Sequence, residues 1–214
     1  RNLAEIIGKD RIEEKLSLNQ PLTCYIGFAP TGQLHLGYLV PCMKIRDLTL
    51  AGCKVAIMIA DVHSLLDERK TPKNLVDFRS DYYCKVLTFI LQLLGADMTC
   101  IRFVRGSEFQ YTGEYNMDVW DLTSRTTIAA AKKAGSEVVK QSKDPLLGSV
   151  IYPLMQVVDE NHIGQCAFNS QIDIELGGVD QRKIFCFSHD NGGAISYFMN
   201  PIISLAKSGK MSAS

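Results

Sequence analysis

The sequence lacks several features that would assign it to a class at once. None of its 214 residues belongs to a run of about 18 apolar residues, the length that spans a bilayer. Its seven cysteines include no C-x-x-C pair, so we expect reduced thiols, no zinc site and an intracellular protein. No basic-then-apolar leader opens the chain, which adds to the expectation of a cytoplasmic protein without a membrane partner. With 23 basic and 23 acidic residues, any contact with RNA must use a local patch.

Alternating apolar runs and helical patterns indicate an α/β fold. Apolar residues make up 46% of the chain and charged residues 21%, which suits one sizeable core. The continuously apolar run Val55–Ala60 is typical of a parallel strand covered on both faces. We also expect strands at Thr23–Phe28, Cys100–Val104 and Ile172–Leu176. This order predicts a Rossmann-like, doubly wound parallel sheet, in which ligands bind at the carboxyl ends of the strands.

The helical patterns comprise a lead-in, two connecting helices and an insertion. We expect residues 2–17 to form an amphipathic helix that is broken near Gly8. One connecting helix begins near His35, and the other begins with Thr71 as N-cap and Pro72 in its first turn. Residues 113–150 are polar and helical and lie between two predicted strands, so we interpret them as an inserted helical segment.

Residues 25–38, Y-I-G-F-A-P-T-G-Q-L-H-L-G-Y, lead from a strand through a Pro/Gly turn into a helix. A helix N-terminus has unpaired N–H groups and carries about half a positive charge, so it attracts phosphate. Gly37 would let a nucleotide approach the backbone closely, and His35 can donate to a phosphate oxygen. The alternative is a capping histidine beside a packing glycine.

Residues 152–159, Y-P-L-M-Q-V-V-D, place three polar side chains on one helical face. These are Tyr152, Gln156 and Asp159; Pro153 suits a first-turn position, which would put Tyr152 near the N-cap. Buried without partners, such side chains would cost free energy. The face is therefore either exposed or binds something polar, and the apolar residues between them favour binding.

Two later segments combine glycine with polar side chains. In residues 173–183 a predicted strand leads into Gly177-Gly178 and then a helix that opens with Asp180 and Gln181. That turn would let backbone amides reach a ribose, whose hydroxyls Asp180 can bind; a packing turn with an N-cap is the alternative. K-M-S-A-S at 210–214 is a loop whose Lys210 suits a phosphate, unless it is simply a solvated terminus.

In this order the segments resemble the class I aminoacyl-tRNA synthetases, whose two signatures are written HIGH and KMSKS. Residues 25–38 are similar to the first signature of archaeal and eukaryotic tyrosyl-tRNA synthetases. Y-P-x-x-Q-x-x-D, G-G-x-D-Q-R-K and G-S-E-F-Q (106–110) are motifs of the same family. The resemblance covers about residues 20–214, and its departures at Tyr38 and Ala213 point to the eukaryotic-type branch. Residues 164–171 look like an insertion, either a surface loop or a lineage-specific feature.

The resemblance implies a role for each matching position. The phenol of tyrosine would be bound by Tyr25 and Asp159, and its ammonium group by Tyr152 and Gln156. Gln181 would face the same pocket, as would His63, which is equally well interpreted as a core histidine. The catalytic residues would be His35, Lys210 and Thr31. The ATP-binding residues would be Gly27, Ala29, Gly37, Tyr38, Gly178, Asp180, Met211 and Ser212.

By the same resemblance, residues 1–214 form the catalytic domain of a class I synthetase. It would use ATP with Mg²⁺ to convert L-tyrosine to tyrosyl-adenylate and would transfer the tyrosyl group to tRNA(Tyr). We expect no bound organic cofactor and no metal held by the protein itself. Members of the family form homodimers through the inserted segment, here 113–150. We expect the anticodon-binding domain that follows in the family to lie outside this chain.

Three rival interpretations remain at this point. A tryptophanyl-tRNA synthetase would have the same fold, but Asp159 and Tyr25 form a pair that suits a phenol. A non-catalytic synthetase-like module that binds tRNA or protein would not need to retain His35 and Lys210. A nucleotidyltransferase of the wider superfamily would lack the Y-x-x-x-Q-x-x-D helix.

Overall fold

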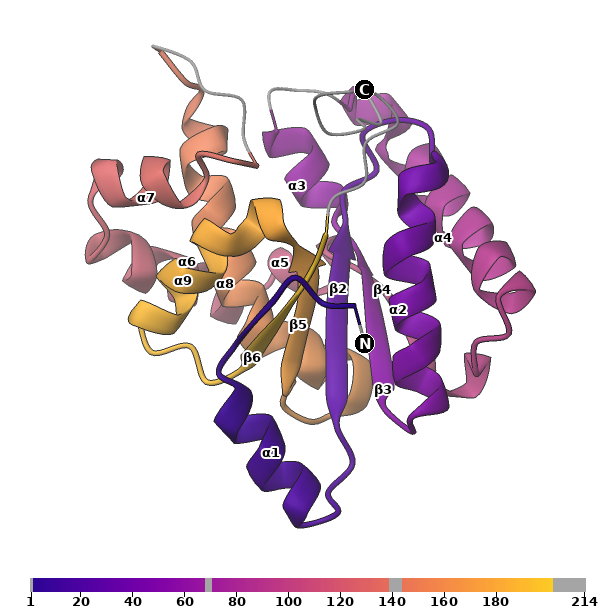
Figure 1. Ribbon diagram of the computed structural model, residues 1–214. Coiled ribbons are helices and arrows are strands. Elements are labelled where there is room, and N and C mark those ends of the chain that lie inside the picture. Colours follow the sequence, from indigo (N-terminus) through magenta and orange to yellow (C-terminus); the bar gives the residue numbers. More distant parts are fainter. Residues whose placement is uncertain (1, 68–70, 139–143, 202–214) are drawn as a thin grey trace.

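The computed structural model describes residues 2–67, 71–138 and 144–201 (Figure 1). Within these residues six strands form one sheet in the order β1-β6-β5-β2-β3-β4. Every neighbouring pair is parallel except β1 with β6, which is antiparallel. The strands are β1 (Glu5–Ile7), β2 (Thr23–Phe28), β3 (Lys54–Ile59), β4 (Ile101–Arg105), β5 (Ile174–Gly178) and β6 (Ser196–Asn200). The predicted doubly wound parallel sheet is therefore confirmed.

Helices cover both faces of the sheet and give it two cores (Figure 1). One face packs against α2 (Leu39–Leu50) and α4 (Val76–Leu93), and the other against α8 (Leu147–Phe168) and α9 (Arg182–Asp190). Because side chains alternate along a strand, Cys24 and Ile26 of β2 belong to the first core, and Tyr25 to the second. The candidate site lies on the α8 side.

Shorter elements complete the fold. The inserted segment is helical as predicted: α6 (Gly113–Ser124) and α7 (Ile128–Ala134) both pack against α8. The remaining helices are α1 (Lys9–Ser17), α3 (Asp61–Leu66) and α5 (Ser107–Gln110). The 3₁₀ turns are η1 (Leu36–Tyr38), η2 (Lys73–Leu75), η3 (Met98–Cys100) and η4 (Val179–Gln181).

The expectation of a helix over residues 2–17 is wrong in its first part. Residues 5–7 form the edge strand β1, paired with β6, and only Lys9–Ser17 is helical. Gly8 separates the two elements with φ of +72°, a left-handed conformation that glycine adopts without steric cost. The break near Gly8 was predicted, but what precedes it is a strand.

Two further expectations about helix ends are wrong. Pro72, not Thr71, is the N-cap of η2, and the hydroxyl of Thr71 donates to the Pro30 carbonyl at 2.9 Å. Helix α8 begins at Leu147, so Pro153 lies inside the helix and Tyr152 is not near its N-cap. In the segment 164–171, residues 164–168 form the last turn of α8, so the surface-loop alternative does not hold for them.

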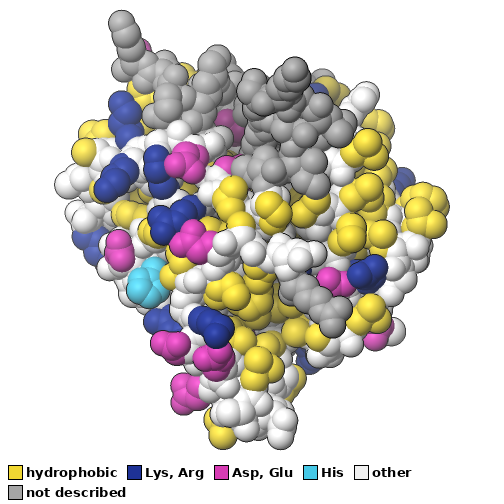
Figure 2. Space-filling model, viewed as in Figure 1, with side chains coloured by type: hydrophobic (Ala, Val, Ile, Leu, Met, Phe, Trp, Pro, Cys, Tyr) yellow, Lys and Arg dark blue, Asp and Glu magenta, His cyan; other side chains and the backbone are white. Residues whose placement is uncertain are grey.

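Neither basic nor acidic side chains dominate the face of the surface that Figure 2 shows. Basic and acidic side chains are interspersed over the side that α7 and α9 occupy in Figure 1. Hydrophobic side chains are more frequent over the α2 side, where Leu39, Met43 and Leu50 are exposed. In the described ranges, no helix combines the length and the apolar character needed to cross a membrane.

Candidate active site

A small pocket lies at the point where the chain reverses its direction of travel through the sheet. From β2 the chain proceeds outward through β3 to β4, and then returns to β5 on the other side of β2. Such a switch point is where doubly wound sheets bind ligands. The pocket holds about 290 Å³ of space, counting its open mouth. Its lining is Tyr25, Gly27, Ala29, Met58, Ala60, His63, Tyr152, Gln156, Asp159, Glu175 and Gln181.

Asp159 is the most constrained side chain of this pocket. It is fully buried, and its Oδ1 accepts from Gln110 Nε2 at 2.7 Å and from the Tyr115 hydroxyl at 2.8 Å. Its Oδ2 has no hydrogen-bond partner. Burial raises the pKa of Asp159 to about 7, although the two donors act to lower it. One oxygen is thus fixed by the protein, and the other is left for a ligand that can donate.

His63 lies beside this carboxylate as a neutral ring. Its Nε2 is 3.6 Å from Asp159 Oδ2, and its ring packs edge-on against Tyr152, with centroids 4.6 Å apart. Burial lowers the pKa of His63 to about 4. Both alternatives for this residue therefore describe it in part, because it is a core histidine that also lines the pocket.

Gln156 and Tyr25 face the pocket from α8 and β2. The amide Nε2 of Gln156 donates to Glu175 Oε1 at 2.8 Å. The Tyr25 hydroxyl is buried and has no hydrogen-bond partner. Burial raises its pKa well above the usual value, and nearby Glu175 adds to this effect, so the phenol stays protonated. A buried hydroxyl without a partner is costly, which is consistent with a polar ligand at this point.

Gln181, the last residue of η4, also lines the pocket. Its Oε1 accepts from the backbone N–H of Gly178 at 3.1 Å, which fixes the turn after β5. A Cβ on Gly177 would meet this same oxygen, and would lie 2.5 Å from Phe185 Cζ. Gly177 is therefore needed for close packing, in line with one of the two alternatives. Gly178, and not Asp180, is the N-cap of η4.

His35 stands at the start of the helical segment that follows β2. Its Nδ1 accepts from the backbone N–H of Gly37 at 3.1 Å, so His35 caps η1. A neutral imidazole whose Nδ1 accepts carries its proton on Nε2, and that N–H can donate to another group. The capping alternative is thus correct, and it leaves the proposed phosphate donor intact.

The loop between β2 and η1 is tied to α4 and to the segment before it. The Thr31 carbonyl accepts from Arg79 Nη1 at 2.7 Å, and the Pro30 carbonyl accepts from Thr71. Tyr38 packs edge-on against the ring of Tyr83, and the two hydroxyls are 3.2 Å apart. The side chain of Tyr38 is therefore engaged in packing.

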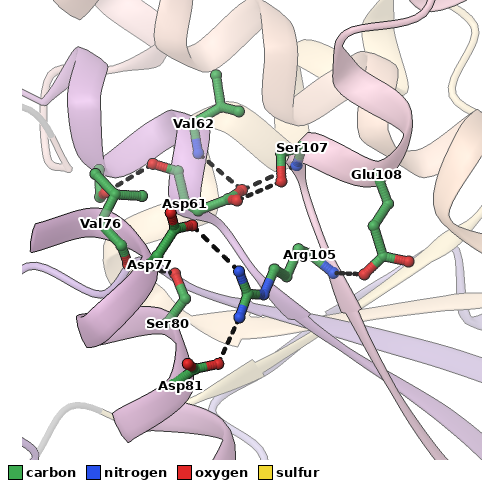
Figure 3. Close-up of polar contacts among 10 residues, drawn as sticks. Asp61, Val62, Val76, Asp77, Ser80, Asp81, Arg105, Ser107 and Glu108 are labelled. Atoms are coloured by element: carbon green, nitrogen blue, oxygen red, sulfur yellow. Dashed lines mark hydrogen bonds and ion pairs between the residues drawn. The ribbon is translucent and has the colours of Figure 1, made fainter. Parts of the chain in front are cut away.

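A network of polar contacts connects the segments at the ends of β3 and β4 with each other and with α4 (Figure 3). The carboxylate of Asp61 accepts from the backbone N–H groups of Val62 and Ser107, both at 2.9 Å, and from the Ser107 hydroxyl. Arg105 reaches across to α4 and pairs with Asp77 and Asp81 (Figure 3). These contacts fix α5, which carries Gln110.

The structure thus brings the predicted tyrosine-binding set together. All its members line one pocket, as do Gly27 and Ala29 of the predicted ATP-binding set. His35, Thr31, Gly37, Tyr38, Gly178 and Asp180 do not line it. Lys210, Met211 and Ser212 lie outside the described residues.

Sequence reasoning did not predict the contacts that three buried polar residues make in the site. Gln110 ends the G-S-E-F-Q motif, for which no contact was predicted, and it donates directly to Asp159. Tyr115 and Glu175 had no predicted role. The one sequence signal for Glu175 was a carboxylate inside an otherwise apolar strand, Ile174–Gly178.

A doubly wound sheet with a helix start at one strand end and a pocket lined by polar side chains beside it is typical of a small-molecule-binding α/β domain. Comparison of the sequence with family models then identifies the family. The chain belongs to the family described as tRNA synthetases class I (W and Y), whose sequence model matches residues 17–214.

Individual relatives agree with this assignment. The cytoplasmic tyrosine–tRNA ligase of Xenopus tropicalis is 43% identical over 219 residues, which cover 100% of this chain and 40% of that protein. The enzyme of the same name from Saccharomyces cerevisiae is 40% identical, with 54% of its length covered. The chain therefore spans about half the length of these relatives or less.

Solved structures show the same fold. The tyrosyl-tRNA synthetase of Archaeoglobus fulgidus, complexed with L-tyrosine, superposes with a TM-score of 0.87 at 30% identity, covering 99% of this chain and 65% of that one. A tryptophanyl-tRNA synthetase from Encephalitozoon cuniculi has a TM-score of 0.72 at 14% identity, over 93% of this chain and 58% of that one. The second likeness shows the fold alone.

Proposed function

We propose that this chain is the catalytic domain of a tyrosine–tRNA ligase. The observation that carries the proposal is the free oxygen of Asp159, buried at the pocket beside the unpartnered hydroxyl of Tyr25. A phenol can donate to the first and accept from the second. An indole N–H can only donate, so it would leave the Tyr25 hydroxyl without a partner. The names of the relatives and the tyrosine bound in the archaeal structure support this choice.

The reaction that fits this site begins with the activation of tyrosine. The tyrosine carboxylate attacks the α-phosphorus of ATP, supplied as its Mg²⁺ complex, and pyrophosphate leaves. Gln156 and Tyr152 would hold the ammonium group, Gln181 would face the same pocket, and His63 would lie near the ring of the substrate, beside Asp159. His35 Nε2–H and the helix start with Gly37 would stabilise the phosphates, together with Thr31 and Lys210. The ribose would lie at Gly178 and Asp180.

The second step is the transfer of the tyrosyl group to the 3′-terminal ribose of tRNA(Tyr). We assign this step to the whole protein, whose relatives are longer than this chain. We also propose a cytoplasmic location, in line with the names of these relatives.

A homodimer through the inserted segment is the assembly that we propose. Large apolar side chains stand exposed on α6 and α7: Met117 at 60%, Trp120 at 64% and Ile128 at 73%. Apolar side chains of this size exposed on neighbouring helices are typical of a protein–protein contact. A Trp120→Glu variant is expected to sediment as a monomer, whereas the unchanged chain sediments as a dimer.

One assay tests the proposed substrate. Exchange of labelled pyrophosphate into ATP is measured with tyrosine, with tryptophan and without any amino acid. We expect exchange that depends on tyrosine and is at background in the other two reactions. Exchange with tryptophan alone would identify the related synthetase, and exchange without an amino acid would indicate a nucleotidyltransferase.

A further inference from the structure

A row of polar side chains crosses the sheet beneath α8. Glu175 of β5 is the register partner of Tyr25 on β2 and of Tyr197 on β6. Register partners point to the same face of a sheet, so the three side chains lie side by side under α8. Gln156 and Glu160 are four residues apart on that helix and therefore project from the same side towards this row.

Two carboxyl groups are buried in this arrangement, Glu175 at 2% exposure and Glu160 at 5%. Glu175 uses one oxygen, Oε1, to accept from Gln156 Nε2. Glu160 also uses one oxygen, Oε2, which accepts from the hydroxyls of Ser188 and Tyr197, both at 2.9 Å. The other oxygen of each, Glu175 Oε2 and Glu160 Oε1, has no hydrogen-bond donor.

The groups around this pair offer no positive charge among the described residues. Tyr25 faces it from β2, Tyr197 from β6, Ser188 from α9 and Asp159 from α8. Burial, above all, raises the pKa of Glu175 and of Glu160, and each carboxyl interacts with the other. Two ionised carboxylates side by side in a dry core repel each other strongly, so one of them retains a proton.

We propose that Glu160 and Glu175 share one proton between their unpartnered oxygens, and that the α-ammonium group of a bound amino acid expels this proton. The inference rests on the proposed function, since Gln156 and Glu175 line the pocket that would hold the ammonium group. On binding, the carboxyl O–H bond breaks and the proton passes to the solvent. The ammonium charge then compensates the second carboxylate.

Glu175 has a second effect in this scheme, as a positioning residue for Gln156. Because the amide N–H group of Gln156 donates to Glu175, its carbonyl oxygen is directed away from Glu175. That oxygen can then accept from the ammonium group of the ligand. An uncharged acceptor at position 175 would keep the amide oriented, but it could not release a proton.

The experiment counts the protons released on binding. Calorimetric titration of the full chain with L-tyrosine is carried out at pH 8 in buffers of different ionisation enthalpy, and the slope gives the number of protons. At this pH Asp159 is already largely ionised, because its pKa is about 7. We expect the unchanged chain to release about one proton more than Glu175→Gln, which keeps the acceptor. Equal slopes for the two proteins would overturn the proposal.

Two further measurements keep the test decisive. The analogue 3-(4-hydroxyphenyl)propanoate has the phenol but no ammonium group, so it should bind without the extra proton release. Carbon NMR of glutamate carboxyls in the unliganded, unchanged chain should show one group that is still protonated at pH 7. If every buried glutamate is ionised there, the shared proton does not exist.

The outcomes distinguish a failure of the shared-proton inference from a failure of the proposed function. If another amino acid binds in place of tyrosine, the substrate assignment fails, and that amino acid becomes the probe for proton release. If no amino acid binds, the proposed function fails and the NMR titration decides whether the proton is shared. Should Glu175→Gln not fold, Glu160→Gln removes the other half of the pair and is expected to abolish the same release.

Discussion

The pocket around Asp159 and the turn at His35 are built in opposite ways. In the pocket, side chains from α5, α6, α8 and β5 fix one another by hydrogen bonds in a buried space, as at Asp159 and Gln156. At His35 a short turn holds one imidazole at a strand end, where its Nδ1 accepts from the Gly37 N–H and its ring packs edge-on against Tyr38. The pocket is thus suited to selecting a ligand by its polar groups, and the turn to attracting phosphate. Changes in the first should alter which amino acid reacts, and changes in the second should alter how fast.

The largest effect should follow from removing the carboxylate that selects the phenol. Asp159→Ala deletes a charge-assisted hydrogen bond to the ligand and leaves Gln110 and Tyr115 without their acceptor. A loss of about 3 kcal/mol corresponds to a fall of about 100-fold in kcat/KM for tyrosine-dependent exchange. The KM for ATP should be unchanged. A comparable loss in kcat/KM for phenylalanine would show that the effect is structural.

Substitutions of His35 should lower the rate of the exchange reaction and leave the selectivity between amino acids unchanged. Removing one preorganised donor lowers kcat about 100-fold, so His35→Ala should reduce exchange by this factor with little change in the KM for tyrosine. The matched variant His35→Asn keeps an acceptor for the Gly37 N–H but loses the Nε2 donor. We expect both variants to lose activity, and only the alanine variant to lose about 1 kcal/mol of stability. Full activity in His35→Asn would mean that the histidine acts as a cap alone.

Close packing behind the pocket can be tested by adding one methyl group. Gly177→Ala would bring a Cβ to 2.5 Å from the buried ring of Phe185 and against Gln181. Overpacking of this kind costs about 1–3 kcal/mol of unfolding free energy, measured by denaturant titration. Gly113→Ala is the control, because no heavy atom lies within 4 Å of the added methyl group. Equal stability for the two variants would show that the turn can relax.

The smallest effect is a pH dependence of tyrosine binding. Burial raises the pKa of Asp159 to about 7, so its acceptor form dominates above pH 7 and is lost below it. In Glu175→Gln, which lacks the proton shared with Glu160, the affinity for tyrosine should therefore fall about tenfold between pH 8 and pH 6. His63 has a pKa of about 4 and stays neutral over this range. When Asp159→Asn is added to this variant, the step near pH 7 should vanish, and an unaltered profile would assign the step to another group.

Sequence alone predicted the sheet and the set of pocket residues well. Both depend on local patterns: apolar runs bounded by turns, and polar side chains at helical spacing. Tyr152, Gln156 and Asp159 share one face of the helix as predicted, although the helix begins at Leu147. Residues at helical spacing share a face wherever the helix begins.

Features that depend on distant contacts were missed. Residues 5–7 form a strand only because β6, about 190 residues later, offers an edge to pair with. Tyr115 reaches Asp159 across 44 residues, and the Glu160–Glu175 pair depends on packing α8 over β5. No local pattern encodes these contacts, since folding alone brings the partners together.

The central claim is that the pocket recognises a phenol hydroxyl. Its most direct test is the ratio of kcat/KM for tyrosine to that for phenylalanine in the exchange reaction. A site whose buried polar groups would be left unpaired by phenylalanine should favour tyrosine by about 10⁴–10⁵. A ratio below about 10 would contradict the account, because Asp159 and Tyr25 would then contribute nothing to the choice of amino acid.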